Sequence, residues 1–414
     1  MRRLPLLALA LILTLSGGLG VMAQHDTTTE LVDGNTAFAL DLYAVLQDDE
    51  GNLFVSPYSI AQALAMTYAG ANGATAEQMA EVLHFTMDAD GVPVAFQTLN
   101  NDLVTRGTAP ADTDNGYPPR SLHIANGLWG EQTFPFSTVF SDTLADHYGA
   151  GLQPADFLND PDGMRQQIND WVAEHTEGKI EDIVPEGAIT EDSRLVLANA
   201  IYFYGGWLDT FNAERTADGD FHLRDGSTTS VPFMHQQAHF SYAAGEGYQV
   251  IELPYAGSQF TFTVILPDEG KFDDVEADLN PESLATALAS AGSRELILAM
   301  PKFEFDYSTS LADALEAMGM TDAFDSSLAD FSGMLEPGSA DPIWIGDVLH
   351  KAFVSVDEKG TEAAAATAVL MAGAAAPTDP PLEVDIDRPF IFLIRDTQTG
   401  TILFIGRVMD PSGA

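Results

Sequence analysis

Histidine is the side chain that most readily binds a metal or moves a proton near neutral pH, and this chain has nine. One close pair, His235 and His239, is spaced four residues apart in MHQQAHF. On a helix, that spacing would turn both imidazoles toward one metal ion. The flanking residues 231–233 and 240–242 predict strands instead, so we expect no metal at this pair.

Motifs for catalysis or nucleotide binding are missing from the sequence. It has no Gly-x-Ser-x-Gly elbow, no His-Glu-x-x-His helix and no Gly-x-Gly-x-x-Gly loop. An Asp-x-Asp-x-Asp-Gly calcium loop is also absent. We therefore expect a protein that is not an enzyme and that needs no cofactor.

The stretch 357–377 suggests a different kind of function, because most of its residues are small and unreactive. Alanine favours a helix, but Gly360 precedes the alanines and Gly373 and Pro377 follow them, which is typical of an exposed loop. Read with a period of two, one face carries no charge, no proline and no large side chain until its end: Thr361, Ala363, Ala365, Thr367, Val369 and Met371. The opposite face carries Glu362. The pattern predicts a loop that can enter a packed sheet as an extra strand.

The sequence EKGTEAAAATAV, residues 358–369, resembles the reactive-centre hinge of inhibitory serpins. Five further stretches resemble serpin signatures and follow the order of that family: residues 52–60, 199–211, 253–255, 301–303 and 387–407. The resemblance covers roughly residues 30–411. It implies an α+β serpin fold: one domain with about nine helices, three β-sheets and an exposed reactive-centre loop near residues 358–381.

The resemblance also implies a mechanism. A target serine protease attacks the loop and forms an acyl-enzyme, and the cut loop then inserts into the main sheet and traps the protease. The implied hinge consists of Glu358, Lys359, Gly360, Thr361, Glu362, Ala363, Ala364, Ala365, Ala366 and Thr367. The alternative is a secreted binding protein of serpin fold that does not inhibit. Proline or charge on the inward face would favour that alternative, and neither occurs there.

The family's usual loop length places the scissile bond fourteen residues after Gly360, between Ala374 and Ala375. A slip of one or two positions stays open, with Met371 less favoured. Alanine at the cut suits a protease with a small apolar pocket, elastase-like or subtilisin-like. No Arg or Lys lies between Lys359 and Arg388, so a trypsin-like target is not expected.

Two polar groupings are implied by the same resemblance. The first is a shutter beneath the main sheet: Ser56, Ser59, Asn199 and His350. Taken singly, each is equally well read as a cap or a satisfied core group. The second is a breach at the top of the sheet, where Lys302 pairs with Glu358 and Trp207 packs. The sequence departs from many relatives at Tyr204-Gly205, where Lys-Gly is common, so a salt bridge from that position is not expected here.

Periodicity places these residues on elements. Ser56 and Pro57 predict the start of a helix, and Thr75 and Gln78 suggest a capping box for the next. Helical spacing also marks residues 29–47, 162–176 and 310–318, and β-rich runs mark 195–204, 250–253, 259–266, 295–305 and 343–356. Helices dominate the first half and strands the second, which indicates an α+β domain.

The N-terminal residues 1–23 have the pattern of a secretory signal peptide: Arg2 and Arg3, an apolar run and a small-x-small site ending at Ala23. Residues 24–29 would be a linker and 30–411 the serpin domain of a secreted monomer. No cysteine is present, so disulfides are excluded.

Acidic residues outnumber basic ones by 62 to 17, a net charge of −45. Loss of Arg2 and Arg3 with the signal peptide would bring the charge to −47. Nucleic acids, anionic membranes and heparin-like cofactors are therefore not expected as partners.

Overall fold

The computed structural model describes residues 16–112, 117–149, 151–339, 342–361 and 380–413. Most of the expected hinge, from Glu362 to Thr367, and the expected scissile bond lie outside these residues. The chain folds as an α+β structure in which helices pack around two hydrogen-bonded sheets.

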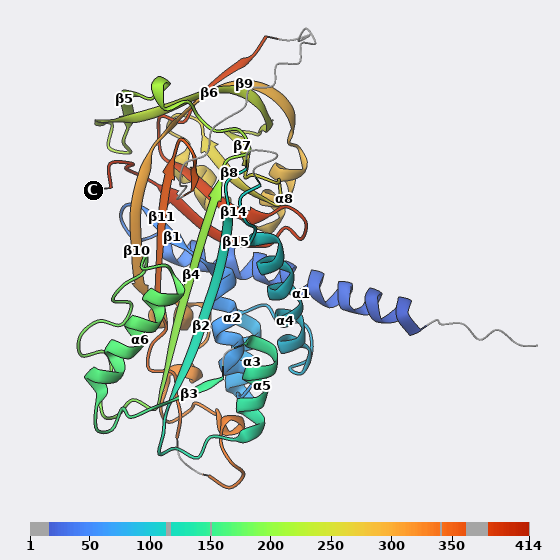
Figure 1. Cartoon of the computed structure of the whole chain (residues 1–414), viewed down its shortest axis with the longest axis vertical. Coiled ribbons are helices and arrows are strands. Elements are labelled where there is room, and N and C mark those ends of the chain that lie inside the picture. The colour runs from blue at the N-terminus through green and yellow to red at the C-terminus, as the bar shows by residue number, and fades with distance from the viewer. Residues whose placement is uncertain (1–15, 113–116, 150, 340–341, 362–379, 414) are drawn as a thin grey trace, which may run out of the picture.

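The smaller sheet has six strands in the order β10-β11-β12-β4-β2-β3. These strands are β10 Phe303–Ser310, β11 Leu349–Asp357, β12 Gly360–Thr361, β4 Leu195–Gly206, β2 Arg120–Glu131 and β3 Leu152–Ala155. In Figure 1, β2, β4 and β11 run side by side along the long axis of the molecule. We call this the main sheet.

The larger sheet has nine strands in the order β1-β15-β14-β8-β7-β6-β9-β13, with β5 paired to β6. They are β1 Leu53–Val55, β5 Ala217–His222, β6 Thr228–Ala244, β7 Tyr248–Pro254, β8 Phe260–Pro267, β9 Gly292–Pro301, β13 Leu382–Asp385, β14 Phe390–Asp396 and β15 Ile402–Val408. Strand β6 pairs with β9 along most of its length and with β7 only at its end, Ser241–Ala244. The two sheets expected beside the main sheet are therefore joined through β6 in the described residues.

Nine α-helices lie within the described residues, as the α+β serpin fold predicts. They are α1 Ser16–Leu46, α2 Pro57–Tyr68, α3 Gly73–Val82, α4 Gly91–Gly107, α5 Thr138–Tyr148, α6 Pro161–His175, α7 Phe272–Ala277, α8 Pro281–Ala289 and α9 Ala312–Met318. Helix α1 begins before the expected cleavage site at Ala23 and continues past it. No helix among the described residues combines the length and apolar character needed to cross a membrane.

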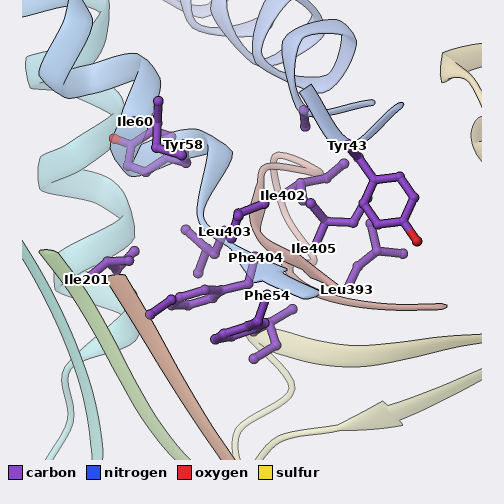
Figure 2. Close-up of a cluster of buried hydrophobic side chains, with 14 of the residues drawn as sticks. Tyr43, Phe54, Tyr58, Ile60, Ile201, Leu393, Ile402, Leu403, Phe404 and Ile405 are labelled. Atoms are coloured by element: carbon purple, nitrogen blue, oxygen red, sulfur yellow. The ribbon is translucent and has the colours of Figure 1, made fainter. Parts of the chain in front are cut away.

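The larger hydrophobic core lies where α1 and α2 meet β1, β14 and β15 (Figure 2). Phe54 on β1 stacks on Phe404 of β15 with ring centroids 4.8 Å apart, and Tyr43 and Tyr58 reach the core from the two helices. A second core lies on the opposite face of the main sheet, where Ile168 and Val172 of α6 pack on β4. Their four-residue spacing puts both side chains on one face of α6, so this helix covers that face of the main sheet.

Local signals for helix ends were partly correct. Ser56 is the N-cap of α2, since its hydroxyl accepts a hydrogen bond from Ser59 N, and Pro57 is the first helical residue. The predicted capping box at Thr75 and Gln78 is wrong, because α3 begins earlier, at Gly73. Both side chains instead accept backbone hydrogen bonds from distant residues: Thr75 from Asp330 and Gln78 from Asp322.

Predicted strands differ from the observed ones mainly at their ends. The run 295–305 divides at Lys302 into β9 and β10, and residues 343–348 precede β11 rather than form part of it. The patterns analysed above did not reveal β2, and of the 17-residue β6 they indicated only residues 231–233 and 240–242. Strand β2 is buried along most of its length, so it lacks the alternation that marks a half-exposed strand.

Candidate functional site

Two residues near the start of the expected loop, Gly360 and Thr361, already lie inside the main sheet. Strand β12 is hydrogen-bonded to β11 on one side and to β4 on the other, with Gly360 opposite Gly206 and Thr361 opposite Gly205. A Cβ atom at Gly360 would collide with the carbonyl oxygen of Gly205, so only glycine permits this approach. Thr361 is buried, and its hydroxyl lies 2.6 Å from the hydroxyl of Tyr255.

The sheet is open below β12. Strands β11 and β4 are parallel and pair directly only where Leu349–Lys351 meets Ala198–Ala200. Between that contact and β12, residues 201–204 of β4 face residues 352–355 of β11, and the two segments do not pair with each other in the described part of the chain. Unpaired backbone groups within a sheet are costly, so this gap is a place where another strand would be stabilised.

The structure places Lys302 and Glu358 together at the top of this gap. Lys302 Nζ donates to Glu358 Oε2 at 2.8 Å, and Thr216 Oγ1 donates to Glu358 Oε1 at 2.7 Å. Burial opposes ionisation of Glu358, but the hydrogen bonds from Lys302 and Thr216 outweigh it and lower the pKa of the carboxyl. Glu358 therefore stays charged at neutral pH and holds the chain just before β12.

Trp207 closes the top of the sheet. Its ring stacks on Tyr255, with centroids 4.9 Å apart and planes 12° from parallel. Its indole Nε1 donates to the carbonyl of Asp357 at 2.9 Å, and its backbone N donates to the carbonyl of Lys359 at 2.8 Å. Trp207 and the contacts of Glu358 thus fix residues 357–359, the turn that precedes β12.

The four shutter residues form one buried network at the lower end of the gap. His350 Nδ1 lies 2.9 Å from Asn199 Oδ1, and the backbone N of Ser56 donates to His350 Nε2 at 3.2 Å. Asn199 Nδ2 donates to Ser59 Oγ at 2.6 Å. Burial lowers the pKa of His350 to about 3, so the ring is neutral, with Nδ1 as the donor and Nε2 as the acceptor.

Asn126 belongs to the same network and was missed by the sequence analysis. Its Oδ1 accepts from Asn199 Nδ2 at 2.6 Å, and it lies on β2, directly opposite Asn199. A signal for it could only have come from placing β2 correctly, because no motif surrounds this asparagine. The network therefore links α2 to three strands of the main sheet: β2, β4 and β11.

Comparison with known proteins identifies the arrangement. The family profile described as "Serpin (serine protease inhibitor)" matches residues 33–411. The chain belongs to the serpin family. In this serpin, β12 lies between β11 and β4, at the top of the open stretch between those two strands.

Similar sequences span almost the whole serpin. An uncharacterised serpin-like protein of Thermococcus kodakarensis is 39% identical over 92% of this chain and 86% of its own length. Antithrombin-III of Mus musculus is 38% identical over 94% of this chain and 83% of its own. The leukocyte elastase inhibitor of Homo sapiens is 37% identical over 92% of this chain and 100% of its own.

Solved structures agree in fold. The native state of the thermophilic serpin tengpin superposes with a TM-score of 0.81 at 30% identity, covering 92% of this chain and 94% of that one. A tumour suppressing serpin superposes with a TM-score of 0.80 at 27% identity, covering 92% of this chain and all of the other. The α+β serpin fold is thus shown by both sequence and structure.

The remaining predicted residues are placed as follows. His235 and His239 lie on β6, and no group of three or more potential metal ligands occurs among the described residues. Gly205 and Gly206 are the residues of β4 that pair with β12. Ala374 and Ala375 lie outside the described residues.

Proposed function

We propose that this serpin is a secreted inhibitor of serine proteases, and that it acts by loop cleavage, acyl-enzyme trapping and loop insertion. The observation that carries the proposal is the position of β12 between β11 and β4, with open backbone below it. The protease serine would attack the carbonyl carbon of Ala374 and form an ester, and the amine of Ala375 would leave with a proton. The cut would free the loop at that end.

The register of β12 predicts where each inserted residue would lie. Thr361 pairs with Val356 of β11 and Gly205 of β4, both antiparallel, so each later residue would meet earlier residues of both strands. Ala363 would lie between Val354 and Phe203, Ala365 between Ala352 and Ile201, and Thr367 between His350 and Asn199. All six of these flanking residues are buried.

Small side chains on this face suit the register. Phe203, Ile201 and Val354 already occupy the core beneath the gap, so a methyl group fits where a large or charged side chain would be obstructed. Thr367 would arrive where His350 and Asn199 now bond to each other. Its hydroxyl can both donate and accept, so it could replace that hydrogen bond as the sheet opens.

Cleavage supplies the freedom that insertion needs. On the far side of the loop, Leu382–Asp385 of β13 pairs with β9 in the larger sheet. While the loop is intact, its two ends are held in different sheets, and the segment cannot enter fully. After the cut, the new strand would gain hydrogen bonds to both neighbours and cover apolar surface, which drives the reaction.

The proposed target is an elastase-like or subtilisin-like protease, because the expected bait is alanine in a run of Ala and Gly. Leukocyte elastase inhibitors of several animals are among the relatives, which supports this choice. The N-terminal pattern supports export, with the covalent complex forming outside the cell without cofactor.

The test mixes the purified chain from residue 24 onward with pancreatic elastase and with subtilisin, followed by denaturing gels. A boiling-resistant band at the summed mass would support a trapped acyl-enzyme, and its loop fragment would locate the cut. Protease with its serine replaced by alanine is the control and should give no band. Cleaved serpin alone, with no gain in melting temperature over the intact chain, would refute the inhibitor proposal.

A further inference from the structure

The strand that follows the expected scissile bond belongs to a sheet region with one face open to solvent. Strand β13 pairs with β9, and β9 pairs with β6, so Glu383, Ile297 and Gln237 lie side by side across three strands. All three side chains are exposed, whereas Leu296 and Leu298, the neighbours of Ile297 on β9, are buried. Because side chains alternate along a strand, Glu383, Ile297 and Gln237 share one face, which we call the outer face. In Figure 1, β6 and β9 lie at the upper end of the molecule.

The outer face carries negative charge that is not neutralised locally. Glu383 and Asp385 are two residues apart on β13, so both side chains point to the outer face, and both are exposed. Neither forms an ion pair within the described part of the chain, and the nearby Arg388 pairs with Asp387 at 2.8 Å. Desolvation raises the pKa of Asp385, the carboxylates of Asp387 and Glu383 raise it further, and His235 and Arg388 only partly oppose them. A positive group beside these carboxylates would therefore be stabilised.

A protease bound at the expected scissile bond would be close to this face. Leu382, the first residue of β13, follows Ala375 by seven residues, and a chain of that length spans at most about 25 Å. A protease domain of about 220 residues has a radius of gyration of about 17 Å, and so a diameter of about 45 Å. The protease is therefore wider than its distance from Leu382, and its surface extends to β13 and β9.

We propose that the outer face of β9 and β13 is a docking surface for basic side chains of the target protease. This inference rests on the proposed function, because it needs a protease at the bond between Ala374 and Ala375. The net charge of −45 attracts a basic protein from a distance, and Glu383 and Asp385 orient it at close range. Ile297, 38% exposed, supplies apolar contact beside them. A second copy of this chain would bring the same negative charge and would be repelled.

The experiment compares two double variants that change the net charge equally. Glu383→Gln with Asp385→Asn removes both carboxylates from the outer face. Its matched control, Glu81→Gln with Asp142→Asn, removes the same two residue types from exposed positions on α3 and α5, in the opposite half of the molecule in Figure 1. The rate constant for loss of the intact chain is measured with pancreatic elastase, a basic protease, at about 20 mM and about 500 mM salt.

At low salt, the outer-face variant should react about fivefold more slowly than the unmodified chain, and the control should stay within about twofold of it. At high salt the difference should vanish, because the charges are screened. The ratio of trapped to cleaved product should be the same in all three chains, since the loop is unchanged.

Equal rates for the two variants, or a rate for the unmodified chain that does not fall with salt, would overturn the docking surface. A changed ratio of trapped to cleaved product in the outer-face variant would also overturn it, because the effect would then lie in the loop. Loss of the intact chain counts trapped and cleaved products together, so it reports docking even where no covalent complex forms. Cleavage without complex would refute the inhibitor proposal alone.

Discussion

A negative charge placed on the inward face of the hinge should abolish the proposed inhibition and leave this serpin a substrate. In the register of β12, position 365 would enter between Ile201 and Ala352, which are both buried, while position 364 would point to the opposite face together with Glu362. Ala365→Glu therefore tests the proposed insertion, and Ala364→Glu is its matched control. The two variants have the same composition and net charge.

The size of the effect follows from the cost of burying the carboxylate. A glutamate of ordinary pKa must take up a proton before it enters the core, which costs about 3.7 kcal/mol at pH 7. If the whole cost falls on the rate-limiting step of insertion, insertion slows by up to about 500-fold. Hydrolysis of the acyl-enzyme then competes successfully with trapping. At pH 5 the same proton costs only about 1 kcal/mol, so the slowing falls to about fivefold.

The assay is the stoichiometry of inhibition of elastase at pH 5 and pH 7, with the covalent complex quantified on denaturing gels. Ala365→Glu should be cleaved without forming complex at pH 7 and should recover complex at pH 5. Ala364→Glu should resemble the unmodified chain at both values and corrects for the pH dependence of the protease itself. Equal loss of complex in the two variants would refute the register, and no loss in either would refute central insertion.

Three further predictions concern other parts of the site. Burial lowers the pKa of His350 to about 3, so the native state should lose stability as pH falls from 6.5 toward 3, by up to about 1.4 kcal/mol per pH unit. His350→Gln should flatten this pH dependence of the free energy of unfolding, measured in urea. An unchanged pH dependence would contradict a buried, neutral His350. Lys302→Met should lower the free energy of unfolding by about 1–2 kcal/mol, because it leaves the buried carboxylate of Glu358 without its cation. Lys271→Met, in an exposed ion pair, should change the free energy of unfolding very little. Equal losses in the two variants would contradict the contact between Lys302 and Glu358. Ala374→Arg should shift inhibition toward trypsin-like enzymes, and an unchanged inhibition profile against trypsin and elastase would place the cut elsewhere.

The sequence predicted features whose signals are local. Ser56 and Pro57 are adjacent to the helix that they start, and the same physical preference that appears in the sequence operates in the structure. Thr75 and Gln78 have an equally good local pattern, yet they bond to residues about 250 positions away. A capping motif shows which hydrogen bonds a side chain can form. Backbone donors from distant parts of the chain determine which bonds Thr75 and Gln78 do form.

The sequence alone could not predict the role of Asn126 or the position of β12, for a related reason. The role of Asn126 depends on the pairing of β2 with β4, and β2 carries no alternating pattern because it is buried along most of its length. Glycine and threonine at positions 360 and 361 fit an exposed loop as well as a strand. Their place in the sheet depends on the close approach of Gly360 to Gly205 and Gly206 of β4, which a Cβ atom at Gly360 would prevent.

The contact between Thr361 and Tyr255 gives β12 a further role. A strand that slipped by one residue would turn Glu362 into the core and every small inward residue outward, because side chains alternate along a strand. The hydroxyl of Tyr255 lies 2.6 Å from that of Thr361 inside the sheet and selects the register in which Thr361 faces inward. This register is therefore fixed before any protease acts. In the proposed mechanism, the cut loop would extend an existing strand instead of searching for its pairing. This would shorten the time in which the acyl-enzyme can be hydrolysed.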